Sequence, residues 1–391
     1  MTRMDQRPPV VFFCYADPSG FSGQRIASEI VIQGLLARGW RCRRLPLPVK
    51  RAAGTNRWSA IVRYLAALLV AWVRSLAMVG TSGARLHLNL GQTRASFIRD
   101  IVPLVTGRLF LGRRNVAVSL HGSLFMRWSA GSLNSRVFVW MLKRAGVVTV
   151  LGERQRAHLQ RLGVATDALH ILPNTCGVPP LSADALRDKL QGRQRRVQIL
   201  HLSTLYDTKG YPQLLEALDD LTPPADVQLD VILCGKVVVG DHSSRFPSVA
   251  AAARWIEERI DSINRNPALN VRWIKGAAGE EKNRLFNETH LFVLPTEYPV
   301  EAQPIVLIEA MASGCAIVTT RVGEIESILD SDTASFLTDT KPATIRSELG
   351  RLIADPVARA GLAGAAWRKY VATLAVDAHI DRWEHIFRRK A

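Results

Sequence analysis

The chain has 391 residues, of which 48% are apolar and 22% are charged, so it is a folded chain long enough for two domains and not a disordered one. Its five cysteines are an odd number without a C-x-x-C pair, which argues against a disulfide framework or a zinc site and suits a reducing cytoplasm. The first apolar run, 10–13, is too short for a signal peptide, and we interpret it as the first strand.

The positive charge lies in one half of the chain. Residues 1–180 hold 25 Lys and Arg against 6 Asp and Glu, a net charge of +19, whereas the other 211 residues hold 26 against 28, a net charge of −2. Frequent arginine in the source proteome would explain the total of +17 but not this asymmetry. A basic half indicates a polyanionic partner, either a membrane surface or nucleic acid. Nucleic acid ranks lowest, because the basic residues lack interleaved aromatics or a recognisable module.

Strands and helices alternate through the first half, as expected for a parallel sheet. The segment 170–180, with its prolines and glycine, is the predicted linker, and we expect the domain boundary near 176–190. The predicted strands are 10–15, 41–46, 85–90, 116–120 and 147–151, and the predicted helices are 24–36, 58–80, 98–111, 137–145 and 154–162.

The predicted helix 58–80 is apolar apart from Arg63 and Arg74, which lie on one face. Three placements remain open: a helix buried in the domain, a helix on the membrane surface, or a spanning helix. Spanning is the least favoured, because each arginine would cost ~2.5–3.5 kcal/mol near the bilayer centre and because strands flank the helix on both sides.

The second half repeats the alternation. The predicted strands are 197–202, 227–234, 271–274, 291–294 and 316–319. The predicted helices are 211–221, 254–263, 280–287, one beginning at 304, 324–329, and helices from 342 to the end, the last of them 367–389.

The stretch 294–323 is the most informative. A short apolar strand ends at Pro295, a loop carries Glu301, and a helix begins at Pro304 and contains Glu309. The unpaired N–H groups at the start of a helix attract phosphate, and Glu309 could reach the hydroxyls of a ribose. The alternative is a surface loop followed by an amphipathic helix whose N-terminus is stabilised by two acids.

The string Glu301-x7-Glu309 followed by A-M-A-S-G-C-A-I-V-T-T-R-V-G resembles the signature of retaining nucleotide-sugar glycosyltransferases of the GT-B fold, specifically glycosyltransferase family 4. The resemblance implies an α/β chain with two Rossmann-like domains facing a central cleft. We expect an acceptor-binding domain at 1–180, a nucleotide-sugar-binding domain at 181–370, and a C-terminal helix at 371–391 that packs back on the first domain.

The resemblance also implies roles for particular residues. Glu301 would hold the hydroxyls of the donor sugar, His121 would contact that sugar from the other domain, and Lys209 would neutralise the leaving diphosphate. The motif departs from the family at Thr204, which stands where an arginine is expected and brings no charge. The expected donor-binding residues are Gly23 (with Ser22 in place of a first glycine), Thr204, Lys209, Gly276, Gln303, Pro304, Ile305 and Glu309.

We therefore predict transfer of a sugar from a nucleotide-diphosphate-sugar to an acceptor hydroxyl with retention of configuration. The sequence shows no D-x-D of the kind that would hold a metal beneath a diphosphate, and we expect neither a metal nor a cofactor. The basic half and the apolar helix favour a lipid-linked saccharide acceptor and a cytoplasmic protein bound peripherally to an anionic membrane. The alternatives are a sugar-nucleotide epimerase of the same fold and a non-catalytic glycan-binding partner of another transferase.

Overall fold

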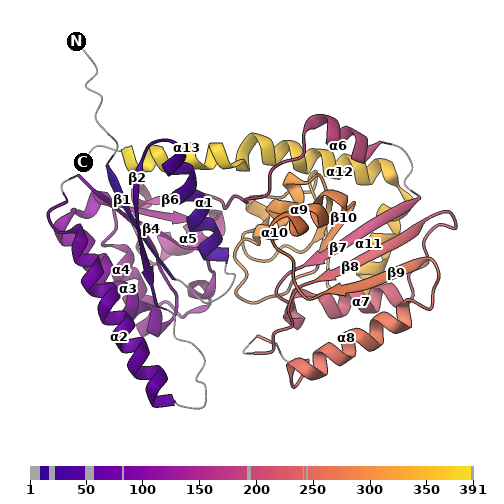
Figure 1. Ribbon diagram of the computed structural model, residues 1–391, viewed down its shortest axis with the longest axis horizontal. Coiled ribbons are helices and arrows are strands. Elements are labelled where there is room, and N and C mark those ends of the chain that lie inside the picture. The colour runs from indigo at the N-terminus through magenta and orange to yellow at the C-terminus, as the bar shows by residue number, and fades with distance from the viewer. Residues whose placement is uncertain are drawn as a thin grey trace, which may run out of the picture. The chain divides into compact units, whose positions relative to one another are not determined.

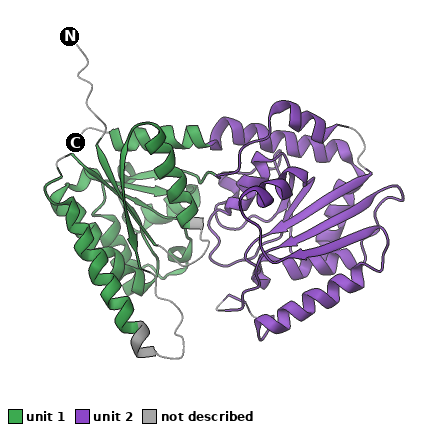
Figure 2. Cartoon of the chain, viewed as in Figure 1, with its two compact units in different colours: residues 1–175, 376–391 green, residues 176–375 purple. Residues whose placement is uncertain are grey.

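The structure is a computed structural model that describes residues 9–16, 23–48, 57–81, 83–191, 195–240, 242–243 and 245–388. The chain divides into two compact units (Figure 2): unit 1 comprises residues 1–175 and 376–391, and unit 2 comprises residues 176–375. These divisions lie five residues from the expected ends at 180 and 370.

Unit 1 is built on a parallel sheet. Within the described residues its six strands run in the order β2-β1-β3-β4-β5-β6 (Figure 1). The order reverses direction once, between β2 and β3, and this is the pattern of a doubly wound sheet with helices on both faces. The strands are β1 Val10–Ala16, β2 Arg41–Leu47, β3 Arg85–Asn89, β4 Val116–Ser119, β5 Val147–Val150 and β6 Leu169–Ile171.

The helices of unit 1 cover the two faces of this sheet unequally. Right-handed crossovers place α2 to α5 on one face and α1 on the other, where α13 joins it. Alternate residues of β1 pack accordingly: Phe12 lies in the core beneath α2 to α5, and Phe13 lies in the core beneath α1 and α13. The helices are α1 Gly23–Ala37, α2 Arg57–Ser75, α3 Arg94–Phe110, α4 Leu133–Leu142, α5 Glu153–Arg161 and α13 Val376–Arg388, with 3₁₀ turns η1 Leu76–Met78, η2 Arg113–Asn115, η3 Leu124–Arg127 and η4 Thr166–Ala168.

The helix expected at 367–389 is wrong as a single element. The chain forms α12 Pro356–Lys369 in unit 2, a π-turn at Tyr370–Leu374 and then α13 in unit 1, with Ala375 extended between them. In unit 1, Ile380, Trp383 and Phe387 bury themselves beside α1, and Arg38 forms an ion pair with Glu384 at 3.2 Å. The break therefore falls where the chain passes from one unit to the other.

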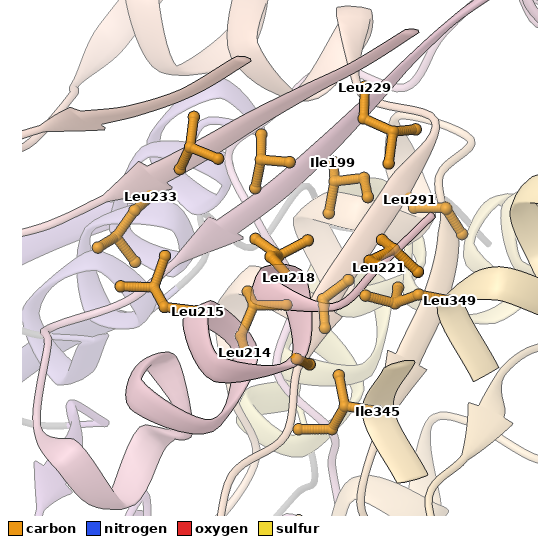
Figure 3. Close-up of a cluster of buried hydrophobic side chains, with 14 of the residues drawn as sticks. Ile199, Leu214, Leu215, Leu218, Leu221, Leu229, Leu233, Leu291, Ile345 and Leu349 are labelled. Carbon is orange, nitrogen blue, oxygen red and sulfur yellow. The ribbon is translucent and has the colours of Figure 1, made fainter. Parts of the chain in front are cut away.

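Unit 2 repeats the architecture. Within the described residues its six strands are parallel and run in the order β12-β11-β10-β7-β8-β9. Figure 3 shows part of its largest apolar core, in which Leu214, Leu218 and Leu221 around α7 meet strand residues such as Ile199 and Leu229. The strands are β7 Arg196–Leu202, β8 Gln228–Cys234, β9 Leu269–Ile274, β10 Leu291–Leu294, β11 Ala316–Thr319 and β12 Ser335–Phe336.

The helices of unit 2 also lie on both faces. Helices α7, α8 and α11 contribute to one core, and α9 and α10 contribute to the other. Two expectations need correction: α8 starts five residues before 254, because Ser248 caps it, and 324–329 contains only a 3₁₀ turn. The remaining elements are α6 Ala183–Leu190, α7 Tyr211–Asp219, α8 Val249–Ile263, α9 Gly279–Glu288, α10 Ile305–Ala312, α11 Pro342–Ala354, and turns η5 Asp207–Lys209 and η6 Ile325–Ser327.

Neutral histidines are part of the core of unit 1. His87 on β3 is buried and shares a hydrogen bond of 2.7 Å with Ser119, and buried His379 on α13 accepts one of 3.1 Å from Trp383. Burial lowers the pKa of both imidazoles to about 3, and neighbouring histidines add to the effect. Both rings are therefore uncharged in the folded protein at neutral pH.

Acid should destabilise unit 1 through these two groups. In the unfolded chain each ring binds a proton near pH 6.5, whereas in the folded chain it does so only near pH 3, so stability falls as the pH drops below about 6.5. The expected loss is about 2 kcal/mol per histidine at pH 5. Urea unfolding followed by tryptophan fluorescence between pH 7 and pH 5 measures it.

The variant His87→Gln keeps a hydrogen-bonding group near Ser119. It should reduce the loss of stability between pH 7 and pH 5 by the contribution of one histidine, about 2 kcal/mol. His385→Gln, an exposed position on α13, is the matched control. An unchanged pH dependence in His87→Gln would contradict this explanation.

Candidate functional site

The candidate site lies at the carboxyl edge of the unit 2 sheet. Parallel strands present their carboxyl ends at one edge, which is where open α/β sheets bind ligands. The loops after β7 and β10 both leave from that edge, and they carry Lys209 and Glu301. The sheet thereby brings together residues that are 92 positions apart in the chain.

Lys209 and Glu301 form an ion pair in the described structure. Lys209 donates to Oε2 of Glu301, and the two side chains are only 13% and 9% exposed. The Lys209 ammonium also lies over the ring of Tyr298, 4.6 Å from its centroid, and Tyr298 stacks on Tyr206 at 5.4 Å. The charge of Lys209 is therefore held in place at the mouth of the site before any ligand binds.

Two glycines allow the loops to approach this closely. Gly323, which follows β11, has φ +60°, and a Cβ there would overlap the carbonyl oxygens of Glu301 and Ala302. Gly210, directly after Lys209, has φ +85°, and a Cβ there would overlap the carbonyl oxygen of Pro295. Any other residue at either position would push the Glu301 loop away from Lys209.

The start of α10 faces the same loop. Pro304 is the N-cap residue and, in the described structure, gives the helix no side-chain cap. The amide N–H groups of Ile305 and Val306 come too early in the helix to have an intrahelical partner, whereas Leu307 donates to the carbonyl of Pro304 at 3.1 Å. The helix dipole adds positive potential at this end. Gln303 is fixed beside these amides by a hydrogen bond of 2.7 Å from its Nε2 to Ser327. This is the geometry of an anion site.

Glu309 lies one turn into α10 and is 98% buried, with an exposed fraction of 2%. Lys282 on α9 donates to its Oε1 at 2.5 Å, whereas its Oε2 has no hydrogen-bond partner among the described residues. Burial raises the pKa of Glu309, and the charge and hydrogen bond of Lys282 oppose that rise. An unpartnered buried carboxylate oxygen is suited to accept a hydrogen bond from a ligand hydroxyl.

Thr204 is exposed after β7 and lies beside a lysine that sequence reasoning missed. Leu205 donates its backbone N–H to the carbonyl of Lys236 at 2.9 Å, so the segment after β7 runs next to the segment after β8. Lys236 is exposed at this edge. Gly276 lies beyond β9 with φ +131°, at the end of the same edge.

The remaining predicted residues, His121 and Gly23, belong to unit 1. His121 follows β4 and shares a hydrogen bond of 3.1 Å with Asn174; burial lowers its pKa to about 4, so the ring is neutral. Gly23 is the first residue of α1, and the loop with Ser22 before it lies outside the described residues. Within the described ranges, no cluster of three or more potential ligands for a metal occurs.

Sequence reasoning also missed Tyr298 and Lys282. Tyr298 lies between Glu297 and Pro299 in the loop, and burial raises its pKa to about 12, assisted by the neighbouring charges of Tyr206 and Glu301. Lys282 is an ordinary helical lysine in the sequence. Neither residue has a local pattern that marks it, because its partner lies on another element.

The chain is similar to known proteins in its second half and in its fold. Residues 182–367 match the family described as glycosyl transferases group 1. A curated relative, the GDP-mannose-dependent alpha-(1-6)-phosphatidylinositol monomannoside mannosyltransferase of Mycolicibacterium smegmatis, is 25% identical over 273 residues; the match spans 66% of this chain and 66% of the relative.

Two solved structures share the fold of the whole chain. HepE of Anabaena, in complex with UDP, has a TM-score of 0.68 at 15% identity and covers 96% of this chain and 98% of its own. Sucrose-phosphate synthase of Thermosynechococcus elongatus has a TM-score of 0.70 at 17% identity and covers 97% and 98%. The GT-B fold is thus confirmed, and the prediction of a glycosyltransferase is confirmed by the group 1 domain. Assignment to family 4 and retention of configuration stay predictions.

The pair of Lys282 and Glu309 should carry a measurable part of the stability of unit 2. Lys282→Met would leave the Glu309 carboxylate buried beside no positive charge, and we expect a loss of about 3 kcal/mol at pH 7. Urea unfolding of the full chain measures this. Lys275→Met, which removes an exposed lysine 3.9 Å from Glu257, is the matched control and should change little.

A second variant separates charge from packing. Lys282→Met combined with Glu309→Leu removes both charges and should recover most of the lost stability. If Lys282→Met alone is as stable as the wild type, the ion pair does not hold Glu309 in the manner described.

Proposed function

We propose that the chain transfers a sugar from a nucleoside-diphosphate-sugar to an acceptor hydroxyl with retention at the anomeric carbon, as members of glycosyltransferase family 4 do. The observation that carries the proposal is the Lys209–Glu301 ion pair held beside the uncapped start of α10. Two neighbouring loops and the start of α10 thereby offer a cation, amide donors and a carboxylate to a single ligand. A sugar diphosphate needs all three.

In this proposal the diphosphate is the leaving group. Lys209 and the N–H groups at the start of α10 take up the negative charge that develops as the bond to the sugar breaks. These donors are fixed before the reaction, so little reorganisation is needed at the transition state. The exposed Lys236 supplies a second positive charge, which compensates for the neutral Thr204.

Glu301 changes partner when the donor binds. The phosphates draw Lys209 toward them, and the Glu301 carboxylate then accepts hydrogen bonds from the hydroxyls of the donor sugar. The unpartnered Oε2 of Glu309 accepts from the ribose, and Gly276 lies against the base. His121, a neutral ring in unit 1, contacts the donor sugar.

For the acceptor we propose a lipid-linked saccharide at the cytoplasmic face of a membrane, such as a precursor of a lipopolysaccharide or exopolysaccharide. Support comes from the basic first half of the chain and from the curated relative, whose name gives phosphatidylinositol monomannoside as its acceptor. We propose a cytoplasmic, peripheral location for the same reasons and no requirement for a metal.

A donor screen tests the transferase. The full chain is incubated with GDP-mannose, UDP-glucose and other nucleotide sugars together with lipid-linked acceptors, and both nucleotide release and glycosylated lipid are measured. We expect Glu301→Gln to lower kcat on the order of 10²-fold to 10³-fold, as loss of one transition-state contact does. Lys209→Met should weaken donor binding by about tenfold or more, because a charge-assisted hydrogen bond is lost.

Lys341→Met is the matched control, since this lysine is 77% exposed and lies at the start of α11. Full turnover in a Lys209→Met/Glu301→Gln double variant would contradict the proposal. Nucleotide release without a glycosylated product would indicate an epimerase. A wild-type chain that binds neither GDP nor UDP in calorimetry would indicate a non-catalytic glycan-binding protein.

A further inference from the structure

Helix α2 of unit 1 exposes a strip of aliphatic side chains along its length. Its inner side is short: Leu68, Ala71 and Met78 of η1 are buried, and Ala71 and Met78 belong to the core beneath α2 to α5. On the opposite side Leu65 is 55% exposed and Leu69 is 60% exposed. At about 100° per residue, the outward residues fall on one side of the helix. They are Val62, Leu65, Leu69, Val73 and Leu76, with Val70 at their margin.

The exposed apolar surface continues on the two helices that follow. Helix α3 contacts α2, and α4 contacts α3, and all three lie on the same face of the unit 1 sheet (Figure 1). Isolated exposed apolar side chains are normal, but a set that extends over three neighbouring helices marks an interaction surface. We call this set the α2–α4 face. It comprises the outward residues of α2, Ile98, Leu109 and Phe110 of α3, and Leu133 and Trp140 of α4.

The charge around the α2–α4 face has one sign. From 57 to 152 the sequence holds thirteen Lys and Arg and a single acidic residue, Asp100. Asp100 is buried, where it binds the guanidinium of Arg99 and accepts from the backbone N–H of Gly91 at 2.8 Å. The one acid of the region is thus used inside the unit, and none reaches the α2–α4 face.

Several basic residues lie at the margins of the α2–α4 face. On the helical wheel of α2, Arg63 and Arg74 fall about 100° to 120° from Val62, between the exposed strip and the buried side. At the far end, Arg108 is exposed on α3, and its charge acts with burial to lower the pKa of Arg144, whose guanidinium lies 3.2 Å from the ring centroid of Trp140. Cations that crowd together around an apolar surface call for an anionic apolar partner.

We infer that the α2–α4 face binds the surface of an anionic phospholipid bilayer. The aliphatic strip lies at the boundary of headgroups and acyl chains, parallel to the membrane plane, and the arginines contact lipid phosphates. The inference rests on the proposed function in so far as a lipid-linked acceptor explains the need for such a surface. Vesicle binding itself requires neither donor nor acceptor, so the two proposals fail separately.

A spanning helix fits less well. Residues 61–78 are long and apolar enough to cross a membrane, and only 22% of them are buried. However, α2 connects β2 to β3 within one sheet, and its inner side packs on the core. Crossing a bilayer would require α2 to leave that core, and the apolar residues against which α2 packs would then be exposed.

Other partners match the face less well. A second copy of the chain would set arginine against arginine, because the region has no acid on this face to meet them. Nucleic acid would meet the charge but would leave the aliphatic side chains uncovered, and it is bound by aromatic platforms and basic grooves instead.

Co-sedimentation of the full chain with vesicles tests the inference. We expect binding to vesicles of phosphatidylcholine mixed with phosphatidylglycerol at low salt, at least tenfold weaker binding to phosphatidylcholine alone, and progressive release as salt increases. Leu69→Trp reports the site directly, because lipids brominated near the top of the acyl chain should quench the fluorescence of the added tryptophan.

Variants locate the surface. Leu65→Glu/Leu69→Glu and Arg63→Glu/Arg74→Glu should each weaken binding by at least tenfold, while circular dichroism confirms that they fold. Val357→Glu in unit 2 is the matched control: the residue is 80% exposed and apolar but lies outside the α2–α4 face, and binding should be unchanged.

Several results would overturn the inference. They are an absence of binding at low salt, equal binding to neutral vesicles, unimpaired binding by both double variants, or a dimer in ultracentrifugation that Leu65→Glu/Leu69→Glu dissociates while vesicles remain unbound.

Discussion

The ion pair between Lys209 and Glu301 depends on the parallel sheet of unit 2, and it is the central feature of the candidate site at the carboxyl edge of that sheet. Two loops that leave neighbouring strands at the same edge bring an ammonium and a carboxylate together with little exposure to water. Removing such a buried pair of charges from water costs free energy, so its presence is poorly explained by stability alone. We attribute it to a role in ligand binding. In this structure Glu301 neutralises Lys209 beside the start of α10. An anionic ligand must therefore compete with Glu301 for the ammonium group, which limits how tightly Lys209 can hold that ligand.

The same logic extends one turn further into α10. Glu309 would be costly in its apolar surroundings if Lys282 did not neutralise it, and its second oxygen remains without a partner in the described structure. Two lysine–glutamate pairs therefore lie near the start of α10: Lys209 with Glu301 in the loops before the helix, and Lys282 with Glu309 one turn into it. The outer pair can open when a ligand binds, whereas the inner pair fixes the orientation of the Glu309 carboxylate. The buried polar groups of unit 1 include the neutral rings of His87 and His379 as well as the ion pair of Arg99 and Asp100.

Much of this arrangement was predictable from the sequence, because it depends on local patterns. The alternation of strands and helices predicted five of the six strands in each sheet, and the short strands β6 and β12 were missed. The spacing of Glu301 and Glu309 placed them before and within one helix. The sequence could not show pairings between elements. Lys282 on α9 lies 27 residues before Glu309 on α10, with strand β10 between them, and nothing local to Tyr298 marks it as the ring beneath Lys209. The break at Ala375 was missed because 367–389 contains neither proline nor glycine, and the break is imposed by the passage between units. For α2, hydropathy left three placements open, and only the packing of the unit shows which side is buried.

The most direct measurement for the central claim is a crystal structure of the full chain with a nucleoside diphosphate. The account predicts phosphate oxygens within hydrogen-bond distance of Lys209 Nζ and of the amide nitrogens at the start of α10, a ribose hydroxyl on Glu309, and Glu301 released from Lys209. A nucleotide bound elsewhere, with the Lys209–Glu301 pair still closed, would contradict it.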